Sequence, residues 1–244
     1  MWRRLLYRKD KIEKVNMSEL EKLLERKVEI ELNNYCKNHL DCSKCKELCA
    51  EVKEYNEINR KIEEVTNMSR RWVIADLHFG HTNVIAYSQR PFADAEEMEK
   101  ELIRKWNNKV SKDDIVYVLG DFTLSRSTEL ISRLCGSLNG HKVLVMGNHD
   151  TRKPANYIAC GFKTAVRKPI LVEPRVVLMH EPPAEEDIFY GMKYIFGHVH
   201  DKKCAADFYG NCRCVSVERT NYEPVDLDQL LKEMDPNAGE RIAY

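Results

Sequence analysis

The segment RWVIADLHFGH at residues 71–81 joins a short apolar run to a group of acidic and imidazole side chains. Its run at 72–75 is β-branched and aromatic, which favours a strand, and Asp76, His78 and His81 follow that strand directly. The same order recurs downstream, where apolar runs at 115–119, 143–146, 176–179 and 194–196 lead into Asp121, Asn148, His180 and His198. A sixth apolar run lies at 215–217. We therefore predict a strand-rich domain whose polar residues stand at strand ends.

Helical stretches at about 95–110 and 128–134 separate the first three apolar runs. Alternation of strands and helices is typical of a layered α/β domain. In open α/β sheets, the loops at the carboxyl ends of the strands meet at the binding crevice. We expect the five polar segments to converge there.

The residue types of these segments are those that hold two divalent metal ions. Ions about 3.5–4 Å apart need an oxygen ligand between them, and Asp121 is the best bridging candidate. Asp76 and His78, two residues apart on an extended segment, can face one ion, as can His198 and His200. Glycines precede Asp121, His198 and the weaker amide donor Asn148, which suits turns where the backbone approaches a cluster closely.

The ordered motifs DLHFGH, GDF, GNHD, LMH and GHVH resemble the calcineurin-like metallophosphoesterase superfamily, of the compact bacterial or phage type, over about residues 71–220. The resemblance implies a four-layered β-sandwich flanked by helices, in place of a doubly wound sheet. It also implies two divalent ions, and it assigns His149 to the substrate phosphate as the catalytic residue. The mixed nitrogen and oxygen ligands accept Mn, Fe, Zn or Ni. The ligands that the resemblance implies are Asp76, His78, Asp121 and His200 for one ion, and Asp121, Asn148, His180 and His198 for the other.

The implied activity is hydrolysis of a phosphodiester or phosphomonoester, of a small nucleotide-like substrate, by attack of a hydroxide that bridges the metals. Leu124 stands where phosphoprotein phosphatases of this superfamily carry a second Asp, which argues against that class. Asp150 and Asp76 are the two candidates for the residue that orients His149. The intervals between motifs are too short for the capping domain that repair nucleases carry.

Three further residues are candidates for the substrate side. His81 either contacts the substrate phosphate or caps a helix that begins near Thr82. Arg90 and Arg126 either clamp phosphate oxygens or form surface or structural salt bridges.

Composition restricts the partners. The chain has 39 basic and 39 acidic residues in 244, so no overall field attracts nucleic acid. A nuclease activity on DNA or RNA is the alternative, with a local patch left open. A catalytically silent binding module is disfavoured because no ligand position is missing. The sequence shows neither a signal-peptide core nor a membrane span, and its nine cysteines are an odd number, so we expect a cytoplasmic protein with no membrane partner.

The first 70 residues contain no Gly or Pro, and their apolar residues recur at helical spacing. We predict an α-helical hairpin over 1–70 and a metallophosphoesterase domain over 71–244. The hairpin either docks on its own chain, forms a homodimer, carries a partner or covers the active-site entrance. Near its turn, four cysteines suggest a structural zinc site, with an iron–sulfur cluster or free thiols as alternatives and His39 as a substitute ligand; they are Cys36, Cys42, Cys45 and Cys49.

Overall fold

The computed structural model describes residues 69–234 together with Lys22, Arg26, Glu57 and Ile58. The chain divides into two compact units, Met1–Met68 and Ser69–Tyr244. The predicted hairpin turn and its cysteines, Cys36, Cys42, Cys45 and Cys49, lie outside the described residues. Among the residues described, none of the helices has both the length and the apolar character needed to cross a bilayer.

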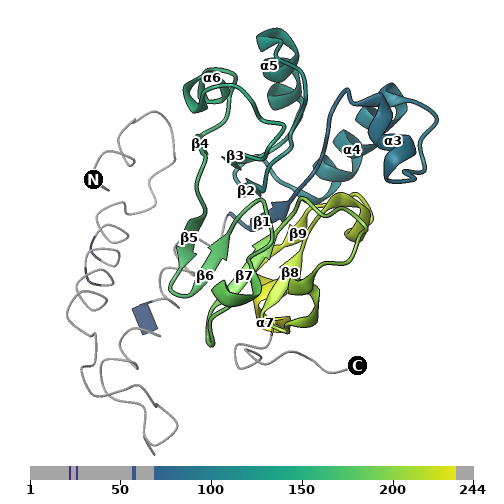
Figure 1. Ribbon diagram of the computed structural model, residues 1–244. Coiled ribbons are helices and arrows are strands. Elements are labelled where there is room, and N and C mark those ends of the chain that lie inside the picture. Colours follow the sequence, from purple (N-terminus) through teal and green to yellow (C-terminus); the bar gives the residue numbers. More distant parts are fainter. Residues whose placement is uncertain (1–21, 23–25, 27–56, 59–68, 235–244) are drawn as a thin grey trace, which may run out of the picture. The chain divides into compact units, whose positions relative to one another are not determined.

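Two β-sheets form the second unit (Figure 1). The first sheet has the order β4-β3-β2-β1-β9, in which β1 to β4 are parallel and β9 is antiparallel to β1. Its strands are β1 Arg71–Ile74, β2 Ile115–Val118, β3 His141–Val145, β4 Thr164–Val166 and β9 Val225–Asp226. The second sheet has the order β5-β6-β7-β8, in which only the β5–β6 pair is antiparallel. Its strands are β5 Ile170–Glu173, β6 Val176–Leu178, β7 Lys193–Phe196 and β8 Cys212–Cys214.

Within residues 69–234, five α-helices connect or flank these strands. The longest begins after Asp94, whose carboxylate accepts the amide hydrogens of Glu96 and Glu97 and so satisfies the free N–H groups of the first turn. The helices are α3 Thr82–Tyr87, α4 Ala95–Lys109, α5 Thr128–Ser137, α6 Pro154–Ala159 and α7 Leu227–Glu233. Three short 3-10 helices lie at Glu185–Asp187, Ala205–Phe208 and Val217–Arg219.

The apolar core lies on both faces of the first sheet. Successive side chains of a strand point to opposite faces. Trp72 and Ile74 of β1 accordingly pack with Trp106 of α4, whereas Val73 packs with Ile195 of the second sheet. The 3-10 helix Ala205–Phe208 packs on a third cluster, which includes residues of β7 and β8. Helices, two sheets and a thin outer cover thus form the mixed α/β sandwich predicted from the sequence.

The predicted helices at 95–110 and 128–134 are confirmed as α4 and α5. The predicted strand at 215–217 is wrong: β8 ends at Cys214, and a 3-10 helix begins at Val217. Val215 still bonds to both sheets, since its amide donates to the Phe196 carbonyl (2.8 Å) and its carbonyl accepts from the Ala75 amide (3.1 Å), and its side chain is buried. Before β8, Cys204 precedes a 3-10 helix, and β8 itself runs parallel to β7. Strands β4, β5 and β9 were not predicted.

Candidate metal centre

The polar segments after β1, β2 and β7 share an unusual backbone. Five of their non-glycine residues have a positive φ, the left-handed region that such residues rarely adopt. Such conformations persist where the surrounding structure enforces them, often at functional sites. They are Asp76 (φ 60°), His78 (51°), Asp121 (54°), His198 (72°) and His200 (53°).

One group of donors consists of Asp76, His78 and His200, whose ligand atoms lie within 4.8 Å of one another. Oδ2 of Asp76 accepts hydrogen bonds from the Ser216 hydroxyl (2.6 Å) and the His198 amide (2.8 Å). Oδ1 of Asp76 and Nε2 of His78 are buried and have no hydrogen-bond partner among the described residues. Buried polar atoms are normally paired, so these two atoms fit a cation.

The second group joins Asp76 and Asp121 to His180, again within 4.8 Å. Nε2 of His180 lies 2.9 Å from Oδ1 of Asn148 and 3.6 Å from Oδ2 of Asp121. Nδ1 of His198 lies 3.1 Å from the same Asn148 oxygen. This part of the site therefore gathers all four residues predicted for the second ion.

Asp121 belongs to the second group and also approaches the first, whereas Asp76 is a member of both groups. Oδ2 of Asp121 is 3.5 Å from Nε2 of His78 on one side and 3.6 Å from Nε2 of His180 on the other. A carboxylate in this place can contact two cations at once, as a bridging ligand must.

Burial shifts the protonation of this cluster. It raises the pKa of Asp76 to about 7, although His200 and the Ser216 hydroxyl act in the opposite direction. It also lowers the pKa of His78 to about 2, helped by nearby cationic groups. Buried carboxylates facing neutral imidazoles need a positive charge, and a divalent cation supplies it while favouring the ionised carboxylate.

The buried ion pair between Arg90 and Glu218 contacts the ring of His200. Nδ1 of His200 lies 2.8 Å from Oε1 of Glu218, and this oxygen also accepts a hydrogen bond from Nε of Arg90 (2.9 Å). Arg90 further donates to the carbonyl oxygens of Asp76 (2.7 Å) and Leu77 (3.0 Å). Burial alone would lower the pKa of His200, but its hydrogen bond to Glu218 and the charge of Glu218 raise it above its usual value. A carboxylate behind an imidazole fixes its orientation and leaves the other ring nitrogen for a metal.

Two glycines leave room for the cluster. A Cβ at Gly120, which has a φ of +84°, would lie 2.2 Å from Nδ1 of His180. A Cβ at Gly147 would lie 2.2 Å from Oδ1 of Asp121. The close approach expected from the sequence therefore exists at both positions.

His149 stands beside the metal ligands. Its backbone amide donates to Oδ1 of Asp121 (2.9 Å), and its ring centroid lies 5.3 Å from that of His78. Neither residue considered as its orienting partner makes a hydrogen bond with its side chain in the described part of the chain. The Asp150 carboxylate instead accepts the amides of Asp121 (2.8 Å), Gly147 (2.9 Å) and Phe122 (3.2 Å). Asp150 is thus a backbone anchor for two of the ligand loops.

The three candidates for the substrate side differ in burial and in the partners of their side chains. His81 occupies the N-cap position of α3 without a side-chain capping bond, and its ring lies 5.4 Å from His78 and 6.4 Å from His149. The side chain of Arg90 is fully buried and paired with Glu218, so Arg90 forms the structural salt bridge that the sequence left open as the alternative to a phosphate clamp. Arg126 is exposed on the rim, where its Nε donates to the Thr151 hydroxyl (3.2 Å).

Sequence reasoning missed Ser216 and Glu218, which hold Asp76 and His200 in place. Both follow β8 and lie far along the chain from Asp76 and Arg90, and neither belongs to a recognisable motif. A signal for Glu218 was a buried Arg90 in need of a partner, and that burial is visible only in the structure.

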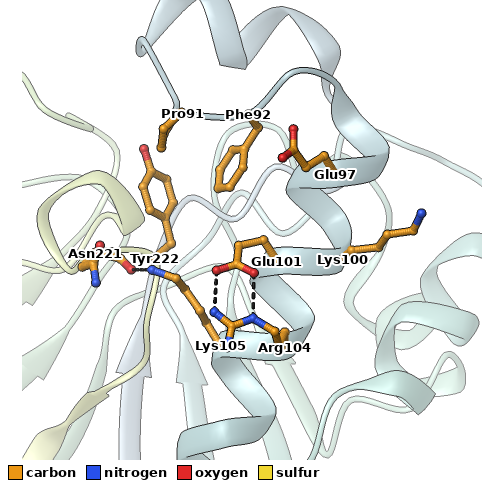
Figure 2. Close-up of a pocket in the computed structure, with 9 residues that line it drawn as sticks. All are labelled: Pro91, Phe92, Glu97, Lys100, Glu101, Arg104, Lys105, Asn221 and Tyr222. Atoms are coloured by element: carbon orange, nitrogen blue, oxygen red, sulfur yellow. Dashed lines mark hydrogen bonds and ion pairs between the residues drawn. The ribbon is translucent and has the colours of Figure 1, made fainter.

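A pocket of about 410 Å³ lies elsewhere, between α4 and the loop at Asn221 and Tyr222 (Figure 2). None of the predicted metal ligands lines it. Its cations are engaged: Arg104 makes two hydrogen bonds with Glu101 (2.6 and 2.7 Å), and Lys105 donates to the Asn221 carbonyl (2.7 Å). The metal-type residues are therefore the stronger functional candidate.

Comparisons with known proteins identify the family of the chain. The family model of calcineurin-like phosphoesterases matches residues 69–182. An uncharacterised protein of Methanocaldococcus jannaschii is 36% identical over 171 residues, which are 68% of this chain and 92% of that protein. The Gene 66 protein of Mycobacterium phage L5 is 39% identical over 93 residues, 36% of this chain and 44% of that protein. A crystal structure of a protein of unknown function from Aquifex aeolicus matches with a TM-score of 0.54 and 26% identity, covering 67% of this chain and 98% of that one. The chain therefore belongs to the calcineurin-like phosphoesterase family.

Proposed function

We propose that the protein hydrolyses phosphoesters with two divalent metal ions. The observation that carries this proposal is the position of Asp121, whose Oδ2 lies 3.5 Å from a nitrogen of His78 and 3.6 Å from a nitrogen of His180. The Asp121 carboxylate thus reaches donors of both groups. Asp76, His78, Asp121 and His200 would hold one ion, and Asp121, Asn148, His180 and His198 would hold the other.

The bound ions would supply Lewis acidity for the phosphoryl group and lower the pKa of a coordinated water. The chain supplies the geometry. Glu218 holds the proton on Nδ1 of His200, which leaves Nε2 of that ring for the metal. His149, beside the ligands, binds the phosphate and donates a proton to the leaving oxygen, a role worth about 10²–10⁴-fold in rate.

The substrate that we propose is a phosphodiester or phosphomonoester of nucleotide-like size. Only α5 and β3 lie between the Asp121 and Asn148 loops, so the described part of the chain has no capping domain at that place. The ligand set of nitrogen and oxygen donors suits Mn, Fe, Zn or Ni.

The test is hydrolysis of bis(p-nitrophenyl) phosphate and p-nitrophenyl phosphate by metal-depleted protein to which Mn²⁺, Ni²⁺ or Zn²⁺ is returned. We expect turnover that requires metal and that the His149→Ala variant loses while its metal content stays near that of the wild type. Arg104→Ala, an exposed change on α4, is the control and should retain turnover. Turnover that is equal with and without metal would contradict the proposal, as would an absence of turnover with every metal and both substrates.

A further inference from the structure

Three arginines form a connected row on the rim beside His149. Nε of Arg126 donates to the Thr151 hydroxyl (3.2 Å), and the amide of Thr151 donates to the His149 carbonyl (2.9 Å). The guanidinium of Arg152 donates to the carbonyl of Arg126. That of Arg167 donates to the carbonyl of Arg152 (2.8 Å). We call Arg126, Arg152 and Arg167 the arginine row.

The row belongs to the loops that carry the candidate site. Arg126 follows the loop of Asp121, and Arg152 follows the loop of His149 and precedes α6. Arg167 follows β4, which packs against α6 at the edge of the first sheet (Figure 1). Two of the three arginines therefore follow candidate ligands by a few residues along the chain, and the third follows the edge strand of the same sheet.

Among the residues that the structure describes, no carboxylate pairs with the row. Within residues 69–234, none of its three members forms an ion pair, whereas Arg71, Arg90, Arg133 and Arg219 all do. Glu129 is the acidic residue whose carboxylate is influenced by Arg152, but its hydrogen bond is with the Ser127 hydroxyl. The bonds of the row go to neutral oxygens, so its positive charge is not cancelled.

The three arginines differ in what they can still bind. Arg152 also donates to the Thr128 hydroxyl (3.0 Å) and is half-buried, so it joins two loops. Arg126 and Arg167 are exposed. In the described part of the chain, Arg126 donates through its Nε alone, and Arg167 donates through one terminal nitrogen. The remaining N–H groups form forks that match two oxygens of a phosphate.

We propose that the arginine row binds a phosphate group of the substrate other than the one being cleaved. This inference rests on the proposed phosphoesterase function and deepens it, because it selects substrates that carry two or more phosphates. Two kinds of substrate carry several phosphates: a single nucleic-acid strand, through its backbone, and a nucleoside polyphosphate. The formal net charge of zero does not oppose the assignment, since binding depends on the local field beside the site.

The test compares the Arg126→Ala/Arg167→Ala double variant with the wild type; Arg152 is kept because it joins two loops. Arg104→Ala is the matched control, since Arg104 is an exposed arginine already paired with Glu101. The readout is the ratio of kcat/KM on a multi-phosphate substrate to kcat/KM on bis(p-nitrophenyl) phosphate. Octathymidylate and adenosine triphosphate are the two arms, and they distinguish the two kinds of substrate.

We expect the double variant to lower the ratio at least about tenfold in one arm or both, because hydrogen bonds to charged groups are among the stronger ones. The control should keep the wild-type ratio. An unchanged ratio in both arms overturns the inference while leaving the proposed function intact.

A second readout does not depend on turnover. Fluorescence anisotropy with labelled octathymidylate, and competition by adenosine triphosphate, should show weaker binding and a smaller salt dependence for the double variant, because fewer phosphate contacts release fewer counterions. If the wild type hydrolyses nothing, the proposed function fails. Equal affinities of the wild type and the double variant would then also overturn the proposal that the arginine row binds phosphate.

Discussion

Replacing Arg90 by Met should strongly destabilise the metallophosphoesterase domain even in the absence of metal. The side chain of Arg90 is 0% exposed and that of Glu218 is 5% exposed, with 2.7 Å between their charged atoms. The change removes the cation and leaves the buried Glu218 carboxylate with His200 but without its arginine partner. It also removes the donor from the carbonyl oxygens of Asp76 and Leu77.

Breaking a buried pair on one side destabilises by about 3–5 kcal/mol. For a domain of this size, each kcal/mol lowers the melting temperature by about 2–4 °C, so we expect a decrease of roughly 6–20 °C. The assay is thermal unfolding followed by circular dichroism, with a chelator present so that metal binding does not contribute.

Arg104→Met is the matched control. Its pair with Glu101 is exposed and local to α4, and exposed pairs contribute little, so its melting temperature should equal that of the wild type. The Arg90→Met/Glu218→Gln double variant should recover part of the loss, because the buried charge is also gone. A decrease below about 2 °C for Arg90→Met would refute the reasoning, since it is less than the expected change for one kcal/mol.

Three further results are expected. Gly147→Ala should weaken metal binding measured by calorimetry, because the added Cβ would lie 2.2 Å from Oδ1 of Asp121. Gly136→Ala is the control and should bind metal normally, since a Cβ there meets nothing within 4 Å. Equal metal affinities of the two variants would contradict the steric argument. Glu218→Gln should lower metal affinity about 10–100-fold, the usual effect of changing the partner behind a metal-binding imidazole, and wild-type affinity would show that the contact is only structural. Burial raises the pKa of Cys135 to about 12. At pH 8 its thiol should therefore resist iodoacetamide until guanidinium unfolds the chain, as measured by peptide mapping. Rapid labelling of Cys135 in the native protein would contradict this expectation.

The sequence predicted the convergence of the candidate ligands because each follows a strand that is recognisable locally. Asp76, Asp121 and Asn148 come directly after apolar runs, and parallel strands bring their carboxyl ends together. The glycines before Asp121 and Asn148 were informative for the same reason.

What the sequence did not reveal depends on contacts between distant segments. The pairing of Arg90 with Glu218 joins residues 128 positions apart and has no local pattern. The run at 215–217 looked like a strand because Val215 and Val217 are apolar, but both are buried by neighbours in other elements. Burial in tertiary structure and strand pairing both produce apolar residues, so a short apolar run alone does not distinguish them.

The number of metal ions bound per chain tests the central claim most directly. Metal-depleted protein is equilibrated with Mn²⁺ or Zn²⁺, dialysed and measured by elemental analysis, as wild type and as Asp121→Ala. We predict two ions per domain in the wild type and at most one in the variant, because the Asp121 carboxylate reaches donors of both groups. A wild type that binds a single ion, or an Asp121→Ala variant that keeps two, would contradict the account.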